Sequence, residues 1–213
     1  MNFDEFLVSL PKIKNIPLPA EASQFKMSPP FRRELIKQYR ERMKDAKRAG
    51  VMALFYPNAS RETHLVLILR NTYKGVHSAQ IGFPGGKFED NDESLKHTAV
   101  RETWEEVGVP EHKIEVVKQM TEVYIPPSNF YVQPYVGITT KTPLFIKQDE
   151  EVKDIIEVPL AHFLDDTIVV TKSVATSYTV KVDVPAFELN GHVVWGATAM
   201  MLSEIKDILK EVL

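Results

Sequence analysis

Residues 85–109 read GGKFEDNDESLKHTAVRETWEEVGV, a glycine pair followed by an acid-rich segment with helical spacing. Ser94 and the acids just before it suit a helix start, and Gly108 suits the position just after a helix end. A glycine pair favours a tight turn, in which the backbone can approach a bound group closely. The sequence therefore predicts a helix over residues 93–107 that is entered from a glycine turn.

Three glutamates gather on one face of this predicted helix. At 100° per residue, Glu102 and Glu106 continue the face that starts at Leu95 and Ala99, and Glu105 lies roughly 60° away. Like charges three and four residues apart repel each other in a bare helix, whereas a hard cation such as Mg²⁺ or Mn²⁺ reverses that cost. The pattern predicts a metal site, with a merely solvent-facing surface as the alternative. A second side is expected to pack on the protein through Val100, Thr103, Trp104 and Val107.

Other groups in the same segment fit such a site. Arg101 lies four residues before Glu105 and eight after Glu93, so it is expected to bridge these two carboxylates. A backbone carbonyl of the glycine turn is a candidate further metal ligand, with an ordinary turn as the alternative.

The rest of the chain mixes strands and helices without a regular βαβ repeat, which favours an α+β fold with a mixed sheet flanked by helices. Turns are expected at 57–60 and at Asn190-Gly191, the latter between two apolar alternations. Strands are expected over residues 51–56, 64–70, 80–86, 114–125, 131–139 and 179–184. Helices are expected over 32–48 and 197–213, and the five prolines of residues 11–30 predict an extended segment. We divide the chain into a lead-in, 1–48, and a main domain, 49–213.

Composition limits the function classes. The chain has 213 residues, a formal net charge of −3 and no cysteine, which argues against a disulfide scaffold and a general nucleic-acid binder. No apolar run approaches the ~20 residues that a membrane span needs. The first ten residues carry two acids and no basic side chain, and the chain ends Glu-Val-Leu. These ends match no common targeting signal, so a cytoplasmic location is expected.

The acidic segment resembles the Nudix box, the signature of the Nudix hydrolases. The box runs glycine, five residues, glutamate, seven residues and then R-E-U-x-E-E-x-G-U, where U is bulky and apolar. Residues 101–109, RETWEEVGV, match its second half, and Glu93 stands seven residues earlier. The chain departs in two ways: Thr103 replaces an apolar residue, and six residues rather than five separate Gly86 from Glu93.

The flanking segments are similar to the coenzyme A (CoA) pyrophosphatase branch of that family. Residues 80–86 read QIGFPGG and are followed by the acids of residues 89–92, as in the branch's entry motif. Residues 128–137 and 187–201 resemble its later strand and its C-terminal hairpin with helix. Asn71, Gly75 and Ala79 differ from the residues usual in the branch.

The resemblance implies a Nudix fold, with a mixed sheet between helices, that hydrolyses a nucleoside diphosphate linked to another group. It implies Glu102 and Glu106 as leading ligands of Mg²⁺ or Mn²⁺, with Glu105 next and Gly86 supplying a carbonyl. Arg101 and Glu93 are expected to orient these ligands. The general base is expected to be Glu102 or the distant Glu151. Expected partners of the substrate are Arg70, His77, Gly85 and Lys87.

The resemblance leaves the substrate open. CoA or an acyl-CoA is the leading expectation, and ADP-ribose or a nucleotide sugar is the alternative within the family. A third possibility is a non-catalytic module that binds a nucleotide to regulate a partner. No nucleic-acid or membrane partner is expected, and a homodimer is possible.

Overall fold

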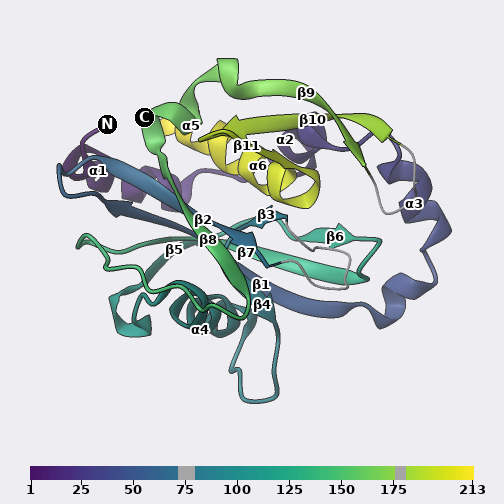
Figure 1. Cartoon of the computed structure of the whole chain (residues 1–213), viewed down its shortest axis with the longest axis horizontal. Coiled ribbons are helices and arrows are strands. Elements are labelled where there is room, and N and C mark those ends of the chain that lie inside the picture. The colour runs from purple at the N-terminus through teal and green to yellow at the C-terminus, as the bar shows by residue number, and fades with distance from the viewer. Residues whose placement is uncertain (72–79, 176–180) are drawn as a thin grey trace.

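The computed structural model describes residues 1–71, 80–175 and 181–213 of the chain. In Figure 1, a central sheet lies between a layer with helix α4 below it and a layer with helix α6 above it. The mixed sheet between helices that the sequence predicts is therefore confirmed. None of the helices within these ranges is long and apolar enough to cross a membrane.

The helices and short 3-10 turns (η) occupy both ends of the chain and the connections between strands. The α-helices are α1 (Phe3–Asn15), α2 (Glu21–Gln24), α3 (Arg32–Gln38), α4 (Leu95–Val107), α5 (Leu160–Leu164) and α6 (Gly196–Val212). The 3-10 turns are η1 (Phe25–Met27), η2 (Arg42–Asp45), η3 (Glu111–Lys113) and η4 (Asp166–Ile168).

The strands form one large and one small sheet. The large sheet contains β1 (Lys47–Pro57), β2 (Thr63–Arg70), β3 (Ile81–Gly82), β4 (Gly85–Lys87), β5 (Glu115–Gln119), β6 (Val123–Ile125), β7 (Phe130–Ile138) and β8 (Val152–Pro159). The small sheet contains β9 (Val169–Ala175), β10 (Lys181–Leu189) and β11 (His192–Trp195). β1 and β7 run parallel, and the other described pairs are antiparallel, so the large sheet is mixed.

Both faces of the central strands are buried, which explains their continuous apolar runs. On β1, Ala53 and Phe55 point into the core on the α6 side, and Leu54 and Tyr56 point toward α4. The α6-side core also takes in side chains from α1 and α5. Alternation along a strand thus places two separate cores on the two faces of one sheet.

The glycine turn sits where β1 and β2 separate. The end of β1 pairs with the start of β2, with Phe55 opposite Leu65. The start of β1 pairs instead with β4, with Val51 opposite Gly85. β3 pairs with the far end of β2 through Ile81. The segment from β3 to β4 therefore fills the gap between the diverging strands and holds the glycine turn against the sheet.

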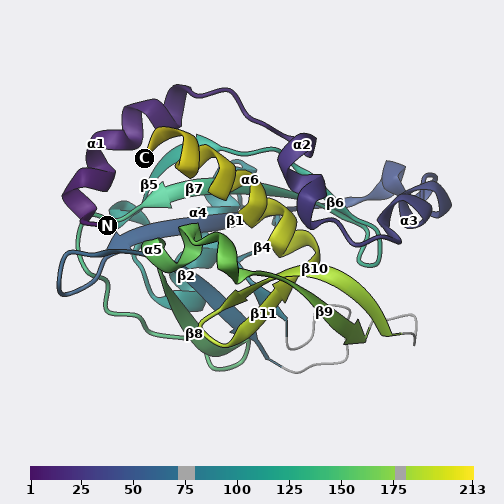
Figure 2. The ribbon, with the colours of Figure 1, turned by 90° about the horizontal axis from the view of Figure 1, so that it is seen from above.

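The C-terminal elements cover the upper face. Asn190 and Gly191, both with positive φ, connect β10 to β11 as the sequence predicts. α6 follows directly and crosses above the large sheet, with the small sheet beside it (Figure 2). The predicted helix over 197–213 is confirmed within one residue at each end.

The N-terminal third differs from the sequence prediction at two places. The helix expected over 32–48 ends at Gln38, and β1 already begins at Lys47, because residues 47–50 pair with β7. The extended segment expected over 11–30 is helical up to Asn15, with Pro11 inside α1, and helical again through α2 and η1. A proline inside a helix costs about 3 kcal/mol, and the complete burial of Phe3 and Phe6 in the core offsets that cost.

Candidate active site

α4 forms where the sequence predicts a helix because both of its ends are capped. The Ser94 side chain accepts a hydrogen bond from the His97 N–H (3.2 Å), and Gly108 ends the helix in the left-handed region at φ 77°. The helix lies unusually close to β1, since a Cβ on Gly50 would come within 2.2 Å of the Leu95 carbonyl oxygen. This approach brings the C-terminal half of α4 beside the glycine turn.

The glycine turn touches two of the three predicted metal-binding glutamates. The Gly85 N–H donates to Glu106 Oε2 over 2.7 Å. A Cβ on Gly86 would lie 2.3 Å from the Glu102 carboxylate, so a larger residue here would displace that carboxylate from the turn. The structure thus brings Gly85, Gly86, Glu102 and Glu106 together, although they come from separate parts of the sequence.

Glu106 is the most deeply buried charged group of the site. It is 1% exposed, and its Oε1 has no hydrogen-bond partner among the described residues. Arg70 Nη1 lies 3.3 Å from this oxygen, in an ion pair without hydrogen-bond geometry. Burial raises the pKa of Glu106 to about 8, and the charges of Glu102 and Glu151 act in the same direction. Burial also raises the pKa of Glu102.

Arg101 is held by Asp92 and not by Glu93. Its Nε and Nη2 donate to the two carboxylate oxygens of Asp92 over 2.9 and 3.0 Å. Asp92 also accepts from the Thr98 hydroxyl (2.9 Å) and from the Glu89 N–H (3.0 Å). Glu93 is exposed, and its N–H donates to His97 Nδ1. The expected bridge from Arg101 to Glu93 is therefore wrong, because the longer loop after Gly86 moves Asp92 into that place.

The other half of the predicted bridge is present. Arg101 Nη1 donates to Glu105 Oε2 over 2.9 Å and lies 3.1 Å from Glu102 Oε1. Arg101 thus connects the buried Asp92 to two of the three glutamates and fixes their orientation. Glu105 is half-exposed, unlike Glu106.

Arg70 and Glu151 reach the site from the end of β2 and from the start of β8. Arg70 Nη1 donates to the Gly85 carbonyl over 3.3 Å, and Arg70 Nη2 lies 3.7 Å from Glu151 Oε2. Burial is the main cause that raises the pKa of Glu102 and of Glu106, and the charge of Glu151 acts in the same direction. The structure brings the distant Glu151 to the same site as the helix glutamates.

The structure gives little support for two of the predicted substrate-binding residues, Lys87 and His77. Lys87 is exposed at the end of β4, and its carbonyl accepts from Arg101 Nη2 over 3.4 Å. His77 lies outside the described residues.

The second packing side expected for α4 is wrong at Trp104, which is 51% exposed. α4 forms the layer below the sheet (Figure 1), so the side of α4 that faces the sheet packs against it, and the exposed Trp104 lies toward solvent. Thr103 and Val107 are buried on the packed side, as expected.

Three further residues organise the site, and their roles were not predicted from the sequence: Asp92, Asn71 and Gln148. The extra residue between Gly86 and Glu93 is a signal that Arg101 would find another partner, and Asp92 is the acid one place before Glu93. Asn71 and Gln148 make contacts between distant loops, for which the sequence holds no local signal.

The site has some of the oxygen ligands that a divalent cation needs, but not, in the part of the chain that the structure describes, a complete set of converging side chains. Among the described residues, no three acidic or histidine side chains converge closely enough to hold a metal ion. The buried Glu106 Oε1 nevertheless lacks a hydrogen-bond donor, and such an oxygen needs a partner. Glu102 and the carbonyls of the glycine turn are further hard oxygen donors beside it. Glu102, Glu106 and Gly86 are therefore the groups that could hold a cation, with Glu105 after release from Arg101.

The chain has a mixed sheet with helices on both faces. It also has a glycine turn that packs against an acidic helix. Together, these two features define the class of α+β protein to which the chain belongs. The NUDIX domain model matches residues 46–174, more than half of the chain. The chain is therefore a member of the Nudix family.

Comparison with individual proteins gives the same family. A protein of Caenorhabditis elegans named peroxisomal coenzyme A diphosphatase ndx-8 is 30% identical over 155 residues, which cover 72% of this chain and 64% of that protein. An uncharacterized Nudix hydrolase NudL of Yersinia enterocolitica is 37% identical over 103 residues, covering 48% of this chain and 52% of that protein. The chain thus spans less than two thirds of either relative.

A solved structure shares the fold. The Nudix hydrolase RenU of M. smegmatis superposes with a TM-score of 0.54 over 79% of this chain and 88% of that chain, at 13% sequence identity. At this identity the likeness supports the fold alone.

Proposed function

We propose that this Nudix protein hydrolyses the diphosphate bond of CoA or an acyl-CoA in a reaction that depends on Mg²⁺ or Mn²⁺. The products would be 3′,5′-ADP and 4′-phosphopantetheine or its acyl form. The observation that carries the hydrolytic site is the buried Glu106 carboxylate against the glycine turn, with one oxygen that accepts no hydrogen bond from the part of the chain that the structure describes. The choice of CoA is supported by the QIGFPGG entry motif and by similarity to the worm CoA diphosphatase.

Glu102, Glu106 and the Gly86 carbonyl would hold the proposed cation, with Glu105 as a further ligand. When bound, a divalent cation neutralises phosphate charge and lowers the pKa of a bound water. Asp92 and Arg101 keep the helix glutamates in place, as outer partners of metal ligands do. Asp92 takes the orienting role that the resemblance gives to Glu93.

The remaining groups bind the diphosphate and move the proton. Arg70 would donate to phosphate oxygens, because its guanidinium faces the glycine turn and is a bidentate donor. A water oxygen attacks one phosphorus, the bond from that phosphorus to the bridging oxygen breaks, and the proton of the water passes to a carboxylate. We assign that proton to Glu151, with Glu102 as the alternative, because Glu151 is half-exposed and its carboxylate lies 3.7 Å from Arg70, which in turn faces Glu106. Lys87 and His77 stay predictions as substrate partners.

ADP-ribose and nucleotide sugars are the alternative substrates. Asn71 and Ala79 differ from the residues usual in the CoA branch, which favours testing these compounds in the same assay. A cytoplasmic location, a homodimer and the division at residue 48 also stay predictions.

The test is product analysis on purified protein with Mg²⁺ or Mn²⁺ and a panel of CoA, acetyl-CoA, ADP-ribose and ADP-glucose. We expect 3′,5′-ADP to be the main nucleotide product. It is diagnostic, because in this panel CoA and acetyl-CoA carry a 3′-phosphate on the nucleotide and ADP-ribose and ADP-glucose do not. AMP from ADP-ribose as the main product would overturn the substrate and keep the hydrolase. Ligand binding without turnover of any compound would favour the non-catalytic nucleotide-binding alternative. The Glu106→Gln variant controls for contaminating hydrolases.

A further inference from the structure

Asn71, the first residue after β2, binds the turn that carries Glu151. Its side-chain Nδ2 donates to the Asp149 carbonyl over 2.7 Å and to the Glu150 carbonyl over 3.0 Å. Its backbone N–H donates to the Glu151 carbonyl over 2.8 Å. One residue thus holds three successive carbonyls of the turn.

Gln148 holds the same turn from its other side. Its N–H donates to the Glu106 carbonyl over 3.1 Å, which ties the turn to the end of α4. Its Oε1 accepts from the Glu151 N–H over 2.7 Å, and its carbonyl accepts from the Val152 N–H over 2.9 Å. The turn is therefore fixed both to β2 and to the backbone of the buried glutamate.

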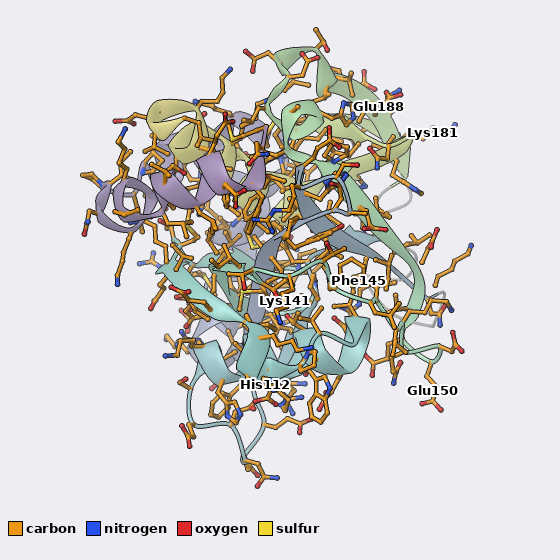
Figure 3. The ribbon with its side chains drawn as sticks, turned by 90° about the vertical axis from the view of Figure 1, so that its left-hand side faces the viewer. His112, Lys141, Phe145, Glu150, Lys181 and Glu188 are labelled. Atoms are coloured by element: carbon orange, nitrogen blue, oxygen red, sulfur yellow. The ribbon has the colours of Figure 1, made fainter. Side chains whose placement is uncertain are left out.

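The side chains of this turn point in different directions. The Glu151 carboxylate faces Arg70 Nη2 at 3.7 Å, and Arg70 in turn faces Glu106. The neighbouring Glu150 is exposed and points away from the protein at the tip of the turn (Figure 3). The backbone conformation of the turn thus decides which of two adjacent glutamates reaches the site.

We propose that Asn71 is a positioning residue for the reaction, which acts by fixing the 148–151 turn so that the Glu151 carboxylate faces Arg70 and the helix glutamates. This inference rests on the proposed function, in which Glu151 takes the proton of the attacking water. It also explains a departure from the CoA branch, where a serine or alanine is usual. A carboxamide donates two hydrogens to two carbonyls, whereas a serine donates one and an alanine none.

A double-mutant cycle with Glu151 tests this inference. We expect Asn71→Ala to lower kcat ~10- to 100-fold, as loss of an outer partner does, with KM for CoA unchanged because the Asn71 amide is engaged by the carbonyls of the turn. In a Glu151→Gln background, Asn71→Ala should produce no further loss, because it acts through the same carboxylate. Losses that multiply, or an unchanged kcat in Asn71→Ala, would overturn the inference.

Two control variants separate positioning from general destabilisation. Glu150→Gln changes the charge of the same turn, and its outward side chain should leave kcat and KM at wild-type values. Asn71→Ser keeps one donor and should recover part of the lost kcat, whereas Asn71→Asp, which has no donor when ionised, should not. A loss of kcat in Asn71→Ser equal to that in Asn71→Ala would count against hydrogen bonding as the cause.

The substrate assignment can fail independently of this inference. If wild-type protein cleaves another nucleoside diphosphate instead of CoA, the cycle is measured on that compound. If it cleaves none, the proposed function fails, and amide hydrogen exchange still reports on the turn. Asn71→Ala should speed exchange of the amides of residues 149–152, and unchanged exchange would overturn the claim that Asn71 fixes them.

Discussion

Two buried carboxylates at the two ends of α4 meet opposite environments. Asp92, just before the helix, is 6% exposed and accepts four hydrogen bonds, two of them from Arg101. Glu106, in its last turn, is 1% exposed and accepts one hydrogen bond, from the Gly85 N–H. Its second oxygen has no hydrogen-bond donor among the described residues.

The pKa values move in opposite directions for that reason. The hydrogen bonds from Arg101 hold the pKa of Asp92 well below its usual range, whereas burial raises the pKa of Glu106 to about 8. A satisfied buried charge stabilises the fold, and an unsatisfied one costs free energy until something binds it. The comparison indicates that Asp92 belongs to the scaffold and Glu106 to a ligand site, since native proteins break packing rules mainly at functional sites.

The strongest test of this difference is Glu106→Gln. We expect kcat to fall by at least ~10³-fold, or about 4 kcal/mol of transition-state stabilisation, because an amide replaces the charged cation ligand. The melting temperature at pH 8 should stay equal or rise, because the variant buries no charge. Steady-state kinetics and thermal unfolding without metal measure the two effects.

Glu188→Gln is the matched control, since Glu188 lies on β10, away from α4 (Figure 3), in an exposed ion pair with Lys172. It should change neither property. A Glu106→Gln enzyme with wild-type turnover would contradict the assignment of Glu106 to the ligand site.

The next largest effect is expected at the other carboxylate. Asp92→Asn leaves Arg101 without its buried partner, and loss of one member of a buried ion pair costs about 3 kcal/mol or more. That corresponds to a fall in melting temperature of about 6–12 °C for a chain of this size. Urea unfolding of the variant gives the free energy directly.

Glu93→Gln, one residue further along the chain, is the paired variant. Glu93 is exposed, so the free energy of unfolding should change by less than about 0.5 kcal/mol. If Glu93→Gln destabilised the protein more than Asp92→Asn, Arg101 would be paired in solution as the family pattern implies.

Local signals in the sequence predicted most of the fold. The caps of α4, the Asn190-Gly191 hairpin and the apolar runs of β1 and β2 depend on nearby residues, and all three are confirmed. Long-range pairing decided the places that were missed. β1 begins early because residues 47–50 pair with β7, about 80 residues away, and α1 continues through Pro11 because distant side chains cover Phe3 and Phe6.

The same division applies to the candidate site. The spacing of Glu102, Glu105 and Glu106 places these residues on one helix, so the sequence alone could group them. Two contacts depend on how the glycine turn and the loop after it fold. Glu106 accepts from Gly85, and Arg101 pairs with Asp92 instead of Glu93. Arg101 pairs with Asp92, and residues 101–109 alone do not indicate this partner.

The raised pKa of Glu106 predicts how metal binding depends on pH. Its pKa in the folded protein is about 8, against an ordinary value of 4.5, so between these pH values the folded chain holds a proton that the unfolded chain releases. Metal-free stability should therefore fall as pH rises from about 5 to about 8. A cation must displace that proton, so stabilisation by Mg²⁺ should grow over the same range, by up to about 1.4 kcal/mol per tenfold gain in affinity.

Melting temperatures with EDTA and with Mg²⁺ from pH 5.5 to pH 9 measure this dependence. Glu106→Gln should abolish the growth with pH, while Asp92→Asn should preserve it. An Mg²⁺ effect that is the same at every pH would show that Glu106 is already ionised in the metal-free protein.

The smallest expected effect lies between the two carboxylates, at Thr103. This residue is fully buried and stands where the family motif has an apolar side chain, and its hydroxyl donates to the Ala99 carbonyl over 2.6 Å. That carbonyl is also positioned to accept the helix hydrogen bond from the Thr103 N–H, so Thr103→Val leaves no buried donor or acceptor without a partner. The free energy of unfolding should change by less than about 1 kcal/mol, with kcat unchanged. A loss of 2 kcal/mol or more in the free energy of urea unfolding would mean that the Thr103 hydroxyl, like the Asp92 carboxylate, stabilises the fold through its hydrogen bond.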